Sequence, residues 1–346
     1  MSVTEENKTA KIGFISRLRA VSCLAIIVLH GFFIPVSLFS PETADRIVPM
    51  IIRNCMLWAV PCFVMVSGAL LLDPQRSITI KDIFTKYIKR AFIALAVFSL
   101  LFVIFDAALN GSLEFTAIIK DWLYKLFTNR SWLHMWYLYM LIGMYLMLPV
   151  FRAAVSHMDG RLLRYTVILL FFFMSVIPTV NNLTGENAGF YIPVYTVYPF
   201  YFFLGYVMMQ DEIRINKALA WILLILSTAA IIAVTYLGLA KDIESFRSLG
   251  NSYAFAAVAV QAAAVFAIAK GSTDRDNAGT RILYAIDKCS FGMYLLHVAA
   301  LYTAYRVFKI NPFEWGGVPL MAAIAAAAAL VSFIVVYALR KLHIKL

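Results

Sequence analysis

Charged residues are scarce in this 346-residue sequence: Asp, Glu, Lys and Arg make up only 14% of it, whereas 62% of the residues are hydrophobic. Soluble domains use about a quarter of their residues as charges, so this composition excludes an ordinary water-soluble fold. The apolar residues form repeated runs of about 20, the length of a membrane-spanning helix. These runs do not alternate as the strands of a membrane barrel do. The sequence therefore predicts an all-α, polytopic integral membrane protein.

Motifs for several kinds of chemistry are also missing. The apolar runs hold no cluster of zinc ligands, no glycine-rich phosphate loop and no pair of carboxylates. Nothing therefore predicts a metal site, a bound cofactor, an ATPase or a carboxylate proton relay. The four cysteines, Cys23, Cys55, Cys62 and Cys289, lie in or beside apolar runs without a Cys-x-x-Cys spacing. We expect them to be inert buried thiols.

Acidic residues are outnumbered, with 19 Asp and Glu against 30 Lys and Arg, which gives a net charge of +11. In membrane proteins an excess of basic residues collects in cytoplasmic loops and beside anionic lipid headgroups. The charge therefore predicts contact with a lipid bilayer and does not predict binding to nucleic acid.

The apolar runs predict about ten transmembrane helices within one membrane domain, 1–346, with no fused soluble domain. The expected spans are 18–38, 48–72, 90–109, 132–151, 163–180, 190–209, 218–238, 251–269, 282–305 and 318–340. The first run is long enough to span and is followed by no small-residue cleavage site, so we expect a retained anchor and no cleaved signal peptide. The stretch 110–130 has mixed charge and predicts an amphipathic helix on the outer face.

The distribution of basic residues predicts the orientation. If the N-terminus is cytoplasmic, 21 of the 30 Lys and Arg residues fall on the cytoplasmic side. They are Lys8, Lys11, Arg17, Arg19, Arg76, Lys81, Lys86, Lys89, Arg90, Arg152, Arg161, Arg164, Arg214, Lys217, Lys270, Arg275, Arg281, Lys288, Arg340, Lys341 and Lys345. This bias predicts that both termini are cytoplasmic.

Arg19 and His30 form the first candidate catalytic pair. They are eleven residues apart, which is close to three helical turns, so they share one face about 16 Å apart along the helix. An ionisable group at mid-membrane depth marks a functional site by default. A neutral imidazole can act as general base or acyl carrier, and a guanidinium suits phosphate. The alternatives are a topological anchor for Arg19 and an interhelical hydrogen bond for His30.

A basic group precedes the third span, where Lys86, Lys89 and Arg90 place three cations within five residues. These side chains would hold the phosphates of a nucleotide-like donor. The alternative is that they fix topology and contact lipid headgroups.

Aromatic and histidine residues mark two later spans. His134 and Trp136 lie at the start of the fourth span and suit a sugar-binding mouth, although aromatic residues at this depth also form the interfacial belt. His297 ends the segment Ser290–His297 and is a second intramembrane imidazole, either a substrate contact or an interhelical hydrogen bond. The segment Val60–Gly68 contains Pro, Ser and Gly, which favour a bend and close helix packing.

Four segments together resemble the membrane acyltransferase-3 family, whose members O-acylate surface polysaccharides in the bacterial inner membrane. Leu18–His30 is similar to the family's arginine, ten residues, histidine signature, and Val60–Leu70 is similar to its second-span motif. His134–Pro149 and Ser290–His297 resemble its fourth-span and late-span motifs. The family usually has an acidic residue where this chain has Ser16, and its spaced basic pair appears here only as Lys86 and Lys89.

The resemblance implies a multi-pass bacterial inner-membrane O-acyltransferase that acts in polysaccharide biosynthesis. The donor would be a cytoplasmic acyl-CoA, expected to be acetyl-CoA, held by Lys86, Lys89, Arg90 and Arg19. His30 would activate an acceptor hydroxyl or carry the acyl group. The acceptor would be a surface glycan or its lipid-linked precursor, bound near His134, Trp136 and His297. The alternatives are a transporter of a small solute or polysaccharide on the same fold, as in the membrane half of a serine racemase, and a non-catalytic scaffold.

Overall fold

The structure is a computed structural model that describes residues 3–189, 192, 194–273 and 277–342. Over these residues it consists of helices joined by loops, without strands. The all-α fold predicted from the composition is therefore confirmed. Arg275 and Lys345 of the charge count, and residues 190, 191 and 193 of the expected span 190–209, lie outside the described residues.

The helices fall into two sets along the chain. The first half holds α1 (Val3–Phe39), α2 (Thr43–Cys55), α3 (Ala59–Leu71), α4 (Ile80–Asp82), η1 (Ile83–Ile88, a π-helix), α5 (Lys89–Leu109), α6 (Phe115–Thr128), α7 (Trp136–Ser156) and α8 (Gly160–Phe171). The second half holds η2 (Phe172–Val176), α9 (Ile177–Thr184), α10 (Tyr198–Met209), α11 (Lys217–Ala240), α12 (Glu244–Gly250), α13 (Ala256–Lys270), α14 (Ala278–Tyr302), η3 (Thr303–Val307) and α15 (Gly317–Lys341).

Seven helical stretches of the described chain are long and apolar enough to cross a membrane. They are Gly13–Phe39, Thr43–Leu71, Ile80–Leu109, Trp136–Ser156, Gly160–Thr184, Lys217–Ala240 and Gly317–Lys341. The protein is therefore a multi-pass membrane protein. The other three expected spans coincide with the short helices α10 and α13 and with α14, so the count of ten stays a prediction, as does the orientation.

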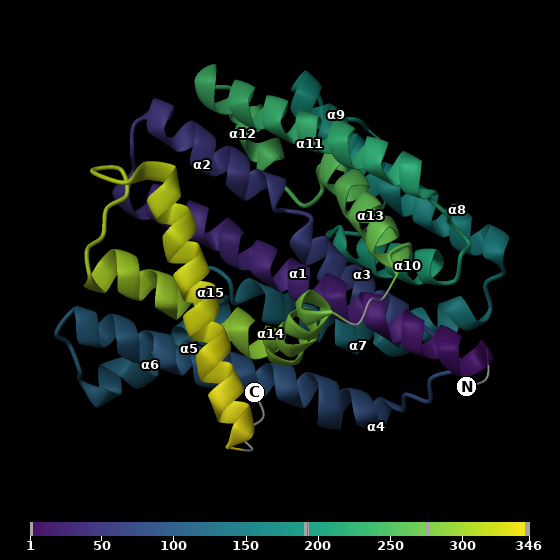
Figure 1. The fold of residues 1–346 in the computed structure, drawn as a ribbon, viewed down its shortest axis with the longest axis horizontal. Coiled ribbons are helices and arrows are strands. Elements are labelled where there is room, and N and C mark those ends of the chain that lie inside the picture. Colours follow the sequence, from purple (N-terminus) through teal and green to yellow (C-terminus); the bar gives the residue numbers. More distant parts are fainter. Residues whose placement is uncertain (1–2, 190–191, 193, 274–276, 343–346) are drawn as a thin grey trace.

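Helix α1 runs through the middle of the bundle and carries the first candidate pair. It packs against α14 and α15 on one side and against α2, α3 and α13 on the other (Figure 1). Because neighbours surround it, α1 is apolar on every face over most of its length. We call the part of the bundle around α1 up to Ile26 the Arg19 half, and the part beyond Gly31 the far half.

Helices α3 and α10 cross at unusually short range, and two glycines make this possible. A methyl group added to Gly68 would overlap the carbonyl oxygen of Phe202, and one added to Gly205 would overlap that of Met65. Small residues at helix crossings allow such backbone contact within membranes. The packing role predicted for Val60–Gly68 agrees with this crossing, which also fixes the wall formed by α3.

Gly68→Ala is expected to lower the free energy of unfolding by about 1–3 kcal/mol, because the obstacle is rigid backbone. The matched control is Gly143→Ala in α7, where a methyl group meets nothing within 4 Å. That control should be neutral or slightly stabilising, since alanine is the better helix former. Thermal unfolding of the purified variants in detergent measures both effects. Equal melting temperatures for the two variants would contradict the role of the crossing.

Helix α6 is present in the stretch predicted to be amphipathic, and it packs beside α5 (Figure 1). The indole of Trp122 donates to the Ala96 carbonyl at 3.0 Å and to the Ser99 hydroxyl at 2.9 Å. This bond joins the middle of α6 to the middle of α5. The helix therefore forms a hairpin with α5, and its opposite face is exposed.

Candidate functional site

Three histidines from three separate segments meet in the middle of the bundle. His30 comes from α1, His297 from α14, and His134 from the turn before α7. They are 7%, 0% and 1% exposed, respectively. The ring centres lie 5.0 Å apart for His30 and His297, 5.3 Å for His134 and His297, and 6.2 Å for His30 and His134. The structure thus brings together one predicted catalytic residue and two predicted substrate contacts.

A hydrogen bond of 2.9 Å joins His297 Nε2 to His30 Nδ1. The other nitrogen of His297, Nδ1, lies 3.2 Å from the Met293 carbonyl oxygen, which can only accept. His297 Nδ1 therefore carries the proton, and in a neutral ring Nε2 must accept. His30 Nδ1 then donates, which leaves a free lone pair on His30 Nε2. This network assigns His30 the tautomer of a general base or nucleophile.

His134 differs from the other two histidines. Neither of its ring nitrogens makes a hydrogen bond of standard geometry within the described residues, and only a weaker contact with the Leu295 backbone is present. A buried polar group without a partner costs about 1–3 kcal/mol, so such groups call for an explanation. Its ring packs against Phe102 and Tyr294, with ring centres 5.5 and 5.4 Å away. The imidazole is therefore held in place while its nitrogens are left available to a ligand.

A cavity of about 520 Å³ lies in the Arg19 half, next to the histidines. Its volume is in the range of small-ligand sites. The lining residues include four cations and many aromatic rings; they are Arg19, Ile26, Phe63, Val66, Ser67, Leu70, Leu71, Arg76, Lys86, Tyr87, Arg90, Ala91, Tyr137, Leu141, Tyr145, Ser290, Phe291 and Tyr294. A site with this charge and with these apolar walls suits an anionic ligand that carries an apolar arm.

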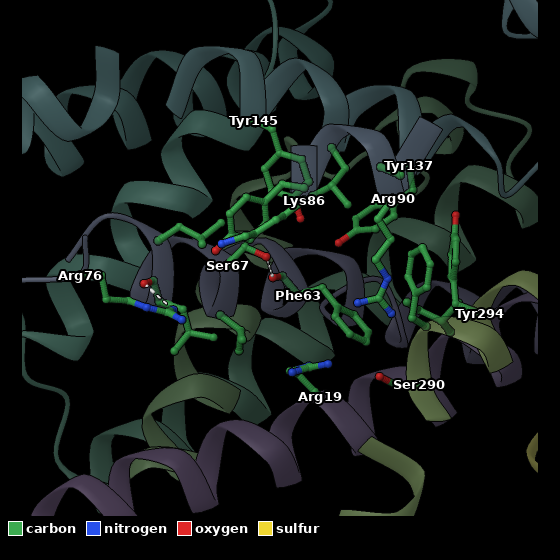
Figure 2. Close-up of a pocket in the computed structure, with 18 residues that line it drawn as sticks. Arg19, Phe63, Ser67, Arg76, Lys86, Arg90, Tyr137, Tyr145, Ser290 and Tyr294 are labelled. Carbon is green, nitrogen blue, oxygen red and sulfur yellow. Dashed lines mark hydrogen bonds between the residues drawn. The ribbon is translucent and has the colours of Figure 1, made fainter. Parts of the chain in front are cut away.

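The four cations approach the cavity from different elements. Figure 2 shows Arg19 on α1, with Lys86 of η1 and Arg90 of α5 across the cavity from it. Arg76 lies at the end of the cavity away from Arg90. Arg90 is stacked over Phe291, with 4.7 Å from its guanidinium carbon to the ring centre. Such stacking keeps a guanidinium in one orientation while its edge remains able to bind phosphate.

Arg19 is oriented by an acid that the sequence pattern did not reveal. Its Nε lies 3.1 Å from Oδ1 of Asp287, which comes from α14. The Ser16 side chain also lies close to this carboxylate. Asp287 therefore supplies, from another helix, the acidic partner that the family usually carries near position 16. The ion pair fixes Arg19 at the wall of the cavity and joins α1 to α14.

The cavity stops one helical turn short of the histidines. On α1 its lining extends to Ile26, and its far wall is formed by Tyr137 and Tyr294, with ring centres 5.4 Å apart. The Tyr294 hydroxyl donates to the carbonyl of His134. The two tyrosine rings therefore separate the basic cavity from the histidines. The shared helical face predicted for Arg19 and His30 exists in α1, but only Arg19 lines the cavity.

The predicted basic group divides between two hollows. Lys86 and Arg90 line the main cavity, while Lys89 lines only a neighbouring hollow of about 420 Å³, which Lys86 and Arg90 share. Lys86 also pairs with Asp82 at 2.5 Å. Arg76, which sequence reasoning counted only for topology, takes a place in the cavity. Arg152 of α7 holds the Arg76 segment by donating to its carbonyl at 2.5 Å.

Trp136 lies outside the histidine cluster. Its ring packs with those of Tyr198 and Tyr253, at 5.7 and 5.6 Å between ring centres. All three rings are half-buried and keep some accessible surface. Tyr137 links the two groups, because its ring contacts both Trp136 and Tyr294. Trp136 therefore lies near the histidines without contacting their rings in the described structure.

Sequence patterns also did not reveal an ion pair near His134, between Asp106 and Arg306. Asp106 of α5 accepts from Arg306 at 2.7 Å and from the Trp132 indole at 2.9 Å. Asp106 could have been noticed in the sequence, because an acidic side chain within an apolar span requires a partner of opposite charge. This network ties α5, η3 and the turn that carries His134 together. In the described part of the chain, no three His, Cys, Asp or Glu residues are placed to hold a metal ion.

The fold and the cavity define a multi-pass membrane protein with a positively charged cavity close to a buried histidine pair. Residues 12–337 match the family model of an acyltransferase domain, so the chain belongs to the acyltransferase-3 family. It is therefore a membrane acyltransferase. No curated protein and no solved structure is similar enough to match this chain.

Proposed function

We propose that this membrane acyltransferase moves an acyl group, with acetyl as the expected case, from cytoplasmic acyl-CoA to a hydroxyl of a cell-surface glycan or its lipid-linked precursor. The observation that carries the proposal is the basic cavity, which the Tyr137–Tyr294 wall separates from a histidine pair whose tautomer leaves a free lone pair. The cations of this cavity can bind the phosphates of a donor, and the imidazole of His30 can deprotonate the hydroxyl of an acceptor.

Acyl-CoA fits the chemistry of the cavity. Its nucleotide end carries phosphates, which suit Arg19, Arg76 and Arg90, and its pantetheine arm is long and mostly uncharged. The separation of Arg19 and His30, about 16 Å along α1, is comparable with the reach of that arm. Donor phosphates bound at the Arg19 half would therefore bring the thioester to the wall formed by Tyr137 and Tyr294.

The proposed chemical step uses His30 Nε2 as general base. Nε2 takes the proton of the acceptor hydroxyl, and the oxygen attacks the thioester carbonyl to form the ester bond. The carbon–sulfur bond breaks, and His30 passes the proton to the departing CoA thiolate, which leaves as the thiol. His297 holds the His30 tautomer throughout, and the His134 ring contacts the acceptor or the carbonyl oxygen. Such proton transfer is worth about 10²–10⁴-fold in rate.

The orientation completes the proposal. The Arg19 half faces the cytoplasm, where acyl-CoA is made, and the far half faces the outer leaflet, as the bias of basic residues predicts. The aromatic group of Trp136, Tyr198 and Tyr253 then lies on the acceptor side of His30.

Purified protein in proteoliposomes with acyl-labelled acetyl-CoA provides the test. Label should pass to an added lipid-linked or polymeric glycan as an alkali-labile ester, with release of one CoA thiol for each ester formed. Flux of solute or glycan across the vesicle membrane, with all label remaining on CoA, would instead identify a transporter on this fold. A scaffold would give neither result.

A further inference from the structure

Arg53 on α2 is a buried cation that has no acidic partner among the residues the structure describes. Arg53 is only 8% exposed, and no carboxylate of the described chain lies within 4.0 Å of its side chain. Its Nη1 donates to the Asn54 side chain at 2.6 Å, its guanidinium carbon lies 5.2 Å from the centre of the Phe33 ring, and its Nε has no partner among the described residues. By contrast, Arg19 and Arg306 each face an aspartate.

This arrangement holds Arg53 in place and leaves its Nε without a hydrogen bond from the described residues. Asn54, which accepts from Arg53, is itself fixed by a 2.9 Å bond from its amide to Thr235 on α11. A buried charge is expensive unless it is paired and hydrogen-bonded. An orientated guanidinium with a free Nε presents the geometry that binds carboxylate or phosphate. Arg53 is therefore prepared for an anion that arrives with a ligand.

The position of Arg53 indicates which ligand carries the anion. Phe33, against which it stacks, follows His30 by three residues on α1, about one helical turn into the far half. The basic cavity lies on the other side of His30. Tyr253 is close enough to Arg53 to interact with it electrostatically, and its ring joins the aromatic group of Trp136 and Tyr198.

We propose that Arg53 binds a carboxylate or phosphate of the acceptor, so that the enzyme acylates an anionic glycan or glycolipid. This rests on the proposed function for the identity of the acceptor. The rings of Trp136, Tyr198 and Tyr253 stack on the apolar face of a sugar, and Arg53 pairs with its charge. The hydroxyl to be acylated then lies between Arg53 and the histidines. Donor and acceptor are thus each recognised by arginine, on opposite sides of His30.

Binding of three matched amphiphiles to the protein in nanodiscs tests this assignment without a donor. The probes are octyl glucoside, octyl glucuronide with its charge on the sugar, and octyl phosphoryl-glucose with its charge between chain and sugar. The wild-type protein should bind one of the charged probes about 10–100-fold more tightly than the neutral one, as expected for a charge-assisted hydrogen bond. The probe that gains identifies the source of the anion.

Three variants assign the preference to Arg53. Arg53→Gln should reduce the preference for the charged probe to within about twofold. Arg53→Lys keeps the charge but loses the planar guanidinium, and it should retain part of the preference. Arg46→Gln removes a charge from the same helix, where Arg46 bonds to Thr43, and should leave the preference unchanged.

Equal wild-type affinity for all three probes, or equal losses in Arg53→Gln and Arg46→Gln, would overturn the proposal. Melting temperatures show whether Arg53→Gln folds, and the wild-type comparison stands if it does not. Because binding needs no acyl-CoA, the proposed function can fail separately: a selective protein that transfers no label would retain the anion site and lose the acyltransfer step.

Discussion

His30→Gln is expected to lower the rate of acyl transfer by about two to four orders of magnitude, because it removes the general base. Donor binding should be almost unchanged, since His30 does not line the basic cavity. Single-turnover transfer of label from acetyl-CoA, together with equilibrium binding of CoA, measures the two effects separately. The variant must be compared at equal amounts of folded, membrane-inserted protein.

His157→Gln is the matched control. His157 is exposed at the end of α7, where it bonds to Ser156 and to the Ala153 carbonyl. Its replacement makes the same chemical change far from the histidine cluster, so transfer should continue at the wild-type rate. If His30→Gln retained more than about a tenth of the wild-type rate, general-base catalysis by His30 would be excluded.

His297→Phe is expected to lower the turnover rate by about 10–100-fold, the usual cost of losing a partner that orients a functional histidine. The phenyl ring fills similar space but cannot accept the proton of His30 Nδ1. His297→Gln should recover most of the rate, because its amide oxygen can accept that hydrogen bond. The KM for acetyl-CoA should stay constant in both variants.

Comparison of these two variants separates positioning from packing. Residue 297 is completely buried, so both changes disturb the core to some extent. A structural role alone predicts that the glutamine variant, which buries an amide, is at least as damaged as the phenylalanine variant. Recovery by glutamine, with unchanged KM, would therefore identify the hydrogen bond to His30 as the source of the effect.

The individual histidines were predictable from the sequence, but their meeting was not. His30, His134 and His297 each stand out as imidazoles within apolar segments. Their convergence depends on how α1, α14 and the turn before α7 pack, and helix packing angles are not encoded in any local pattern. His297 was predicted as either a substrate contact or an interhelical hydrogen bond. The structure shows the hydrogen bond, and only the packing of α1 against α14 identifies His30 as its partner.

The basic cavity was predicted in part. Lys86 and Arg90 line it as expected from their spacing before the third span, whereas Lys89 points to the neighbouring hollow. The π-helical turn η1 ends just before Lys89 and alters the register of these side chains. No residue in the sequence predicts this turn. Arg76 and Asp287 enter the site through long-range packing, which sequence spacing does not reveal.

The membrane spans show a similar division. Long apolar helices such as α1 and α15 were predicted from hydropathy because their length alone satisfies the bilayer. Helix α10 is too short to span by itself, yet nearly all of its side chains are buried by neighbouring helices, α3 among them. Apolar composition reports burial and does not distinguish lipid from protein as the surrounding medium.

The wall formed by Tyr137 and Tyr294 has a consequence for how much donor is wasted in the proposed reaction. A thioester held beside an activated imidazole is readily hydrolysed if water reaches both, and closed sites suppress such side reactions. Here the two rings lie between the cavity and the histidines, and the Tyr294 hydroxyl is tied to the turn that carries His134. In the proposed reaction, an acceptor that binds against His134 would disturb this hydrogen bond and open the passage. Acyl-CoA would then remain intact in cells that lack glycan.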